Sequence, residues 1–114
     1  MPMRAIPYSE LIARNLRAAR AAAKLTQDDV AERMNALGFT WWAQTVSRVE
    51  NNHREVTVAE ILGLAVALET GITGLMHPAA DWQHVTLPDG FEVVLPASWT
   101  AYQPSETWKR NQLR

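Results

Sequence analysis

The sequence predicts a mainly α-helical domain of five helices followed by a C-terminal β-hairpin. Five stretches between residues 8 and 76 carry apolar residues at helical spacing. The pattern changes afterwards, because WQHVTLPDGFEVVLPASW alternates and holds a Pro-Asp-Gly turn at residues 88–90 between two apolar runs. We therefore expect residues 1–78 to form a helical domain, and residues 79–114 to form a hairpin extension and tail.

The composition indicates one ordinary globular domain. The chain has 114 residues, of which 47% are hydrophobic and 20% are charged. No apolar run is long enough to span a membrane, and the first residues do not resemble a secretory signal, so we expect a cytoplasmic protein. The absence of cysteine excludes disulfides and cysteine-based zinc sites.

The sequence gives little support to catalysis or metal binding. His53, His77 and His84 are scattered over different predicted elements, so we expect no metal site and no cofactor. Glu50 and His53 are the nearest approach to a catalytic pair, but no nucleophile or glycine-rich phosphate loop accompanies them. An enzyme is therefore the weakest of the functional interpretations.

Positive charge gathers near the N-terminus although the net charge is −1. Residues 1–24 contain one acid, Glu10, and five bases: Arg4, Arg14, Arg17, Arg20 and Lys24. A locally basic face is compatible with phosphate binding, and a solvated helix face is the other interpretation.

The first two helices are expected in YSELIARNLRAARAAAKL, residues 8–25, and LTQDDVAERMNAL, residues 25–37. Ser9 and Thr26 are the predicted N-caps, and Gly38 is the predicted stop of the second helix. The stripe of the second helix that should face inward comprises Val30, Ala31, Met34 and Leu37.

The third and fourth helices are expected in WAQTVSRVEN, residues 42–51, and TVAEILGLAVALE, residues 57–69. Thr40 is a possible N-cap of the third helix, which should end at two asparagines. Thr57 and Glu60 form a capping box at the start of the fourth, and Gly71 should end it. The core positions of these two helices are predicted to be Val46, Val49, Ile61, Leu62, Leu64, Ala65 and Leu68. The short ITGLM segment, residues 72–76, should close the core.

Three motifs in order, LTQDDVAERM, QTVSRVEN and TVAEILGLAVAL followed by ITGLM, resemble the DNA-binding domain of Cro/cI-type (XRE) repressors. The resemblance covers residues 9–76 and omits the hairpin. It implies a lambda-repressor-like helix-turn-helix fold whose third helix enters the major groove of duplex DNA.

The resemblance also implies roles for individual residues. Gln44 matches a base-reading position, and its amide can pair with adenine. Gln27 matches a phosphate-binding position at a helix start. The full set of implied DNA-binding residues is Gln27, Gln44, Thr45, Ser47, Arg48, Asn51, His53 and Arg54. Arg20 and Glu50 match an ion pair that ties the first helix to the recognition helix.

The chain departs from the family in one place. From Ala31 to Ser47 it is about five residues longer than the usual spacing, and the excess lies in NALGFTWW. Either the second helix runs longer or the loop bulges. We expect Trp41 to fill the core with help from Phe39, and Trp42 either to cover the loop or to touch a sugar or a thymine methyl group.

These observations predict sequence-specific binding of double-stranded DNA, by a transcriptional repressor that acts through operator occupancy. A homodimer on an inverted repeat is expected. The alternative is an antitoxin-like or phage-type regulator whose C-terminal hairpin binds a partner protein. A further alternative is an interaction module that has lost DNA binding.

The hairpin has three possible roles: it covers its own domain, pairs edge to edge with a second subunit, or binds another protein through residues 79–114. Trp82, Trp99 and Trp108 fit an interface or a small satellite core.

Overall fold

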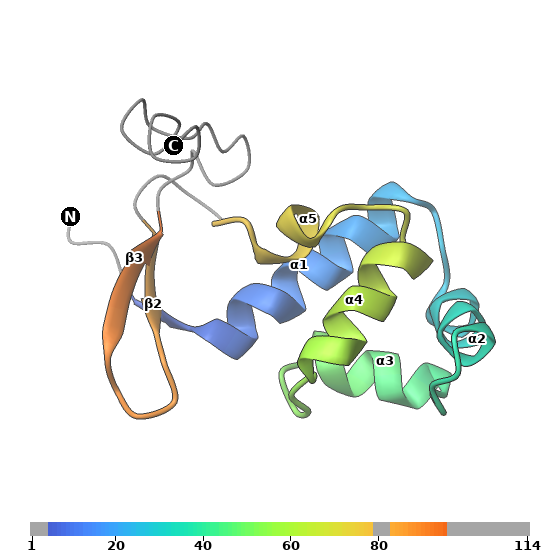
Figure 1. Cartoon of the computed structure of the whole chain (residues 1–114), viewed down its shortest axis with the longest axis horizontal. Coiled ribbons are helices and arrows are strands. Elements are labelled where there is room, and N and C mark those ends of the chain that lie inside the picture. The colour runs from blue at the N-terminus through green and yellow to red at the C-terminus, as the bar shows by residue number, and fades with distance from the viewer. Residues whose placement is uncertain (1–4, 79–82, 96–114) are drawn as a thin grey trace, which may run out of the picture.

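The computed structural model describes residues 5–78 and 83–95 of the chain. In order, the elements are β1 (Ile6–Pro7), α1 (Tyr8–Ala22), α2 (Gln27–Ala36), α3 (Ala43–Glu50), α4 (Val58–Ala67), α5 (Ile72–Met76), β2 (Gln83–Thr86) and β3 (Glu92–Leu95). The helices α2, α3 and α4 pack at one end of the molecule, and the hairpin lies at the other end beside the start of α1 (Figure 1). The predicted class, five helices followed by a hairpin, is confirmed.

Side chains cap two of the helices as the sequence predicts. Thr26 Oγ1 accepts the Asp29 N–H at 3.0 Å, and the Asp29 carboxylate accepts the Thr26 N–H at 2.8 Å. Thr57 and Glu60 make the same reciprocal pair at the start of α4. Each pair satisfies backbone donors that a helix start leaves without a partner.

Two predicted caps are wrong. Pro7, not Ser9, is the N-cap residue of α1: Pro7 is extended, with ψ 144°, and Tyr8 and Ser9 already belong to the helix. Trp42, not Thr40, is the N-cap residue of α3, and its N–H donates to Thr45 Oγ1 at 3.1 Å. The N-cap of α3 therefore lies two residues later in the chain than the predicted N-cap, Thr40.

Left-handed residues end several helices. Gly38 has φ +99° after α2, and Asn52 has φ +58° after α3. The predicted stops at these positions are confirmed, because glycine and asparagine tolerate this conformation. The stop of α4 is misplaced in the prediction: α4 ends at Ala67, Glu69 adopts φ +52°, and Gly71 instead precedes α5.

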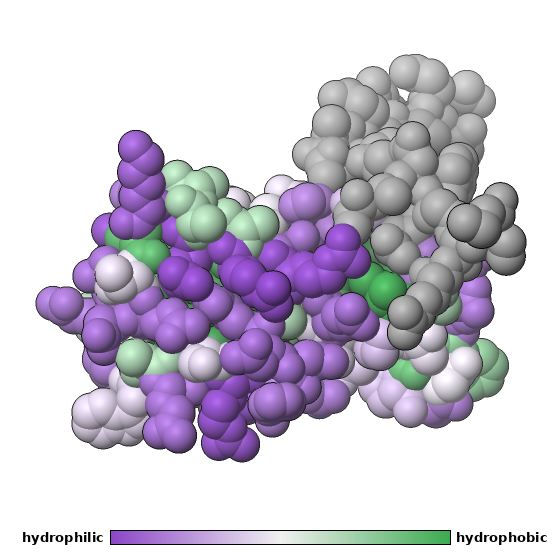
Figure 2. Space-filling view, turned by 180° about the vertical axis from the view of Figure 1, so that it is seen from behind, coloured by the Kyte–Doolittle hydropathy of each residue, from purple (hydrophilic) through white to green (hydrophobic). Residues whose placement is uncertain are grey.

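The main core lies between the helices. Its buried members are Leu16, Val30, Ala31, Met34, Trp41, Val46, Val49, Leu64, Ala65, Ala67, Leu68 and Leu75. Two predicted core positions are wrong: Leu37 is 45% exposed, because α2 ends there, and Leu62 is 51% exposed, because it lies on the outer face of α4. From behind, the surface is mostly hydrophilic with separate apolar patches (Figure 2).

The hairpin belongs to a three-stranded sheet in the order β1-β2-β3. β2 and β3 pair antiparallel around the predicted turn, and β1 pairs parallel with β2, so that Ile6 lies opposite Val85. Ile6, Leu11, Val85 and Leu95 form a second, smaller core. The inner face of the hairpin therefore covers part of its own chain, as the first of its three expected roles requires.

The division of the chain at residue 78 stays a prediction. β1 and Leu11 lie before residue 78, yet they pack with the hairpin after it. The tail after Leu95 and three tryptophans, Trp82, Trp99 and Trp108, lie outside the described residues.

Candidate nucleic-acid interface

The connection between α2 and α3 holds the extra residues. Since α2 ends at Ala36 and α3 begins at Ala43, the loop bulges and the helix is not extended. The Asn35 side chain closes this loop: Nδ2 donates to the Trp41 carbonyl at 2.6 Å and to the Ala31 carbonyl at 2.9 Å, and Oδ1 accepts the Trp41 N–H at 3.0 Å. Three hydrogen bonds from one amide fix where the chain enters α3.

Trp41 anchors the loop in the core. Its side chain is 2% exposed, and its Nε1–H donates to Glu60 Oε2 at 2.9 Å. Phe39 packs against the same core and lies close to Gly63 of α4. A Cβ atom there would lie 2.6 Å from Phe39 Cε2. The prediction that Trp41 fills the core with help from Phe39 is confirmed.

Glu60 joins the loop to α4 and to the segment after α3. Arg54 Nη2 donates to Glu60 Oε2 at 2.8 Å, and the Arg54 guanidinium carbon lies 5.2 Å from the centroid of the Trp41 ring. Burial alone would raise the pKa of Glu60, but the hydrogen bonds from Arg54, the Thr57 N–H and Trp41 outweigh burial and lower this pKa to about 2. The carboxylate is therefore ionised at neutral pH.

Glu50 at the end of α3 holds the first three helices together. Its carboxylate is 4% exposed and accepts from Arg20 Nε at 2.6 Å, from Arg20 Nη2 at 3.0 Å and from Gln27 Nε2 at 3.2 Å. Its carbonyl oxygen accepts from Arg17 Nη2 at 2.7 Å. The ion pair expected between Arg20 and Glu50 is confirmed, and it sets the position of α3 against α1 and α2.

One face of α3 is left open to solvent. Val46 and Val49 are buried, whereas Gln44, Arg48 and Asn51 are exposed. Their spacing of four and three residues places them on the same side of a helix. The structure therefore brings together a neutral amide, a guanidinium and a second amide on one surface.

Thr45 and Ser47 lie at the edge of this surface and are half-buried. The Thr45 hydroxyl accepts the Trp42 N–H at the start of α3. Ser47 accepts from Asn51 Nδ2 at 2.9 Å through its carbonyl and at 3.3 Å through its hydroxyl. Both residues therefore shape the ends of α3 in this structure.

The remaining predicted residues lie in different settings. His53 is exposed, whereas the half-buried Gln27 side chain donates to Glu50. The backbone amides of Gln27 and Asp28 open α2 and have no acceptor within the helix. Arg54 is turned inward to Glu60, so a phosphate contact by its guanidinium would have to compete with that ion pair.

Sequence reasoning paired Arg20 with Glu50 of α3, but it did not place Arg14 or Arg17 beside that helix. A groove is lined by Glu10, Ala13, Arg14, Arg17, Glu50, Asn51 and Asn52. Arg14 is exposed and forms no ion pair with any residue in the described part of the chain. The basic excess before residue 24 was the available signal, but it could not show that two of these arginines flank the end of α3.

Across residues 5–78 and 83–95, no three side chains of the metal-binding types cluster closely enough to hold an ion. Among the same residues, no helix is long and apolar enough to cross a membrane.

Comparison with known protein families identifies the family of this chain. The family described as helix-turn-helix matches residues 16–75, more than half of the chain. The chain belongs to the helix-turn-helix family of the XRE type. This membership supports a role in DNA-binding transcription regulation.

A solved structure gives the same relationship. The restriction-modification controller protein C.AhdI from Aeromonas hydrophila is similar with a TM-score of 0.52 and 28% identity. The similarity covers 59% of this chain and 94% of the controller protein. No curated protein matched the sequence.

Proposed function

We propose that this helix-turn-helix protein reads a specific duplex sequence with α3 and represses transcription by occupying its operator. The observation that carries the proposal is the shared exposed face of Gln44, Arg48 and Asn51. An amide can pair bidentately with adenine, and a guanidinium can pair with guanine or a phosphate. The likeness to a controller protein supports a small regulator of this type.

Backbone contacts would position α3 in the groove. The first amides of α2, near Gln27, suit a phosphate because they point out of a helix start. His53 and Asn51 lie beyond the other end of α3, and Arg14 and Arg17 flank that end from α1. In this proposal Thr45 and Ser47 contact DNA at the margin of the surface, and Arg54 acts mainly through Trp41 and Glu60.

We expect a homodimer that binds an inverted repeat. The outer face of α4 exposes Val58, Leu62 and Val66 at a spacing of four residues, and Ile72 of α5 is 46% exposed. The inner face of the hairpin is already covered by its own chain. We propose the α4–α5 surface as the dimer contact, because its exposed apolar side chains are spaced along one helix face, with half-sites about one helical turn apart.

Two variants distinguish the candidate dimer surfaces. Val66→Glu should give a monomer by analytical ultracentrifugation, because it places a charge in the proposed contact. Val94→Glu, on edge strand β3, should leave the dimer intact. The reverse pattern would assign dimerisation to the hairpin.

A second function is favoured by the exposed edge of the hairpin. Phe91, the residue before β3, is 69% exposed, and Val94 on β3 is 45% exposed. β3 is an edge strand of the described sheet. Such an edge can pair with another protein. This supports the antitoxin-like or phage-type alternative, in which the hairpin binds a partner while α3 binds DNA.

A promoter assay tests repression by occupancy. The preferred site is placed either across the polymerase-binding region of a reporter promoter or well upstream of it. Occupancy predicts that only the overlapping site lowers transcription, and that Arg48→Ala relieves the effect at equal protein level. Activation, or equal repression from both positions, would reject this mode of action.

A further inference from the structure

Trp42 is an unusual residue for a polar surface. Its side chain is 69% exposed, whereas its neighbour Trp41 is 2% exposed. With most of its side chain in water, Trp42 covers little of the loop. An indole left in water contributes no burial energy to the fold, so this side chain is a candidate contact for a bound molecule.

The backbone that carries Trp42 is fixed on both sides. The Trp42 N–H donates to Thr45 Oγ1 at 3.1 Å, which joins it to the first turn of α3. The preceding Trp41 is held by Asn35 through its backbone and by Glu60 through its indole nitrogen. The backbone at Trp42 is therefore held in place by hydrogen bonds, although it follows a long loop.

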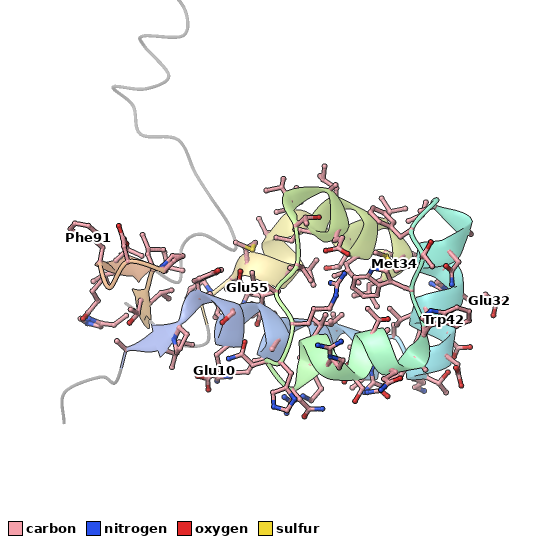
Figure 3. The ribbon with its side chains drawn as sticks, turned by 90° about the horizontal axis from the view of Figure 1, so that it is seen from below. Glu10, Glu32, Met34, Trp42, Glu55 and Phe91 are labelled. Carbon is pink, nitrogen blue, oxygen red and sulfur yellow. The ribbon has the colours of Figure 1, made fainter. Side chains whose placement is uncertain are left out.

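Trp42 is also placed where a recognition helix meets base edges. It is the N-cap residue of α3, two residues before Gln44. The N-terminal residues of a recognition helix are those that approach the bases. Seen from below, Trp42 lies at the start of α3 beside α2, far from the other labelled exposed aromatic residue, Phe91 (Figure 3).

We propose that Trp42 determines specificity by packing its indole against the 5-methyl group of a thymine in the major groove. In the major groove, that apolar methyl group distinguishes thymine from the other bases. The flat face of an indole can cover it without needing a hydrogen-bond partner. The inference deepens the proposed function and rests on it, since it requires α3 to bind duplex DNA.

Removing single methyl groups from the DNA tests this proposal. The motif is first recovered by selection from a random duplex library, and each of its thymines is then replaced, one at a time, by deoxyuridine. This replacement deletes the 5-methyl group and keeps the base-pairing edge. Affinities are measured by fluorescence anisotropy at one salt concentration for the wild-type chain, Trp42→Ala and Trp42→Phe.

At one thymine per half-site, deoxyuridine should weaken wild-type binding roughly three- to tenfold. Trp42→Ala should bind the thymine and deoxyuridine duplexes equally at that position, and Trp42→Phe should keep part of the difference. Leu37→Ala, which removes a partly exposed apolar side chain from the other end of the same loop, should keep the full wild-type pattern. Circular dichroism and thermal melting establish that the variants are folded.

The outcomes separate this proposal from the proposed function. A recovered motif in which no methyl deletion weakens wild-type binding would overturn the role of Trp42 and leave specific DNA binding intact. An equal penalty in wild type and Trp42→Ala at every thymine would do the same, because another residue would then contact the methyl group. Failure to recover any motif would overturn both proposals.

Discussion

The indole Nε1–H of Trp41 donates a 2.9 Å hydrogen bond to the carboxylate of Glu60, and this bond fixes the long loop before α3 to the first turn of α4. The same carboxylate accepts from Arg54 and from the Thr57 N–H. One buried acid therefore connects the loop before α3, the segment after α3 and the start of α4. The surface on α3 depends on this connection for its position.

Acid should weaken the fold through Glu60. Its pKa is lowered from 4.5 to about 2 in the folded protein, so the carboxylate adds stability above pH 4.5, and this stability is lost as the pH falls towards 2. After allowance for solvent screening we expect a contribution on the order of 2 kcal/mol. Urea unfolding across this range measures it.

Glu60→Gln is the control for that pH dependence. Asp29 also has a lowered pKa, because it accepts the Thr26 N–H, and it should persist as a smaller source of acid sensitivity in the variant. The variant should therefore lose less stability than the wild type between pH 4.5 and about 2. Parallel pH profiles for the two proteins would show that Glu60 does not carry the effect.

Breaking the Arg20–Glu50 pair from one side should be costly. Arg20→Met leaves the 4% exposed Glu50 carboxylate with only the weaker Gln27 contact, and we expect a loss of about 3 kcal/mol in the free energy of unfolding. Arg14→Met, at an exposed position of the same helix, should change stability by less than about 0.5 kcal/mol. Chemical denaturation measures both.

The double variant Arg20→Met with Glu50→Met separates ion pairing from packing. It removes the stranded charge and should recover part of the stability lost in Arg20→Met alone. Additive losses in the two single variants would mean that the two side chains do not interact as the structure indicates.

Deleting residues 79–114 should leave a folded helical domain. All buried members of the main core lie between residues 16 and 75, so that core stays complete. Ile6 and Leu11 lose their cover from Val85 and Leu95, so a lower melting temperature is expected. Loss of the cooperative thermal transition would instead place the hairpin in the folding unit and move the predicted boundary.

Arg14 should contribute a phosphate contact. Arg14→Gln is expected to reduce the slope of log affinity against log salt by about 1, and to weaken specific and non-specific duplexes alike. Arg33→Gln is a matched charge change between α2 and α4, where Arg33 donates to the Ala67 carbonyl, and should leave the slope unchanged. Equal slopes for wild type and Arg14→Gln would remove the α1 groove from the interface.

Local sequence signals predicted the helical domain well, because its elements are fixed by near neighbours. The Thr57–Glu60 box and the left-handed Asn52 are determined within a few residues, and both are found in the structure. β1 could not be predicted in this way: Ile6–Pro7 becomes a strand only through pairing with Val85 and Thr86, almost eighty residues later. The alternating pattern of the hairpin gave no indication of that partner.

The candidate site was predicted in outline rather than in detail. Motif position identified α3 and its exposed Gln44 and Arg48. The inward turn of Arg54 depends on Glu60 and Trp41, which meet it only in the folded chain. The exposure of Leu62 likewise depends on which face of α4 packs against α2. Because α4 is apolar on most sides, its sequence does not indicate which face is buried.

Selection from a random duplex library at physiological salt, with wild type and Gln44→Ala in parallel, tests the central claim most directly. The account predicts that the wild type enriches an inverted repeat with half-sites about one helical turn apart. Gln44→Ala should lose preference at one base position per half-site, a change worth about 1–3 kcal/mol of discrimination. No enrichment by the wild-type protein, or an unchanged motif in the variant, would contradict sequence readout by α3.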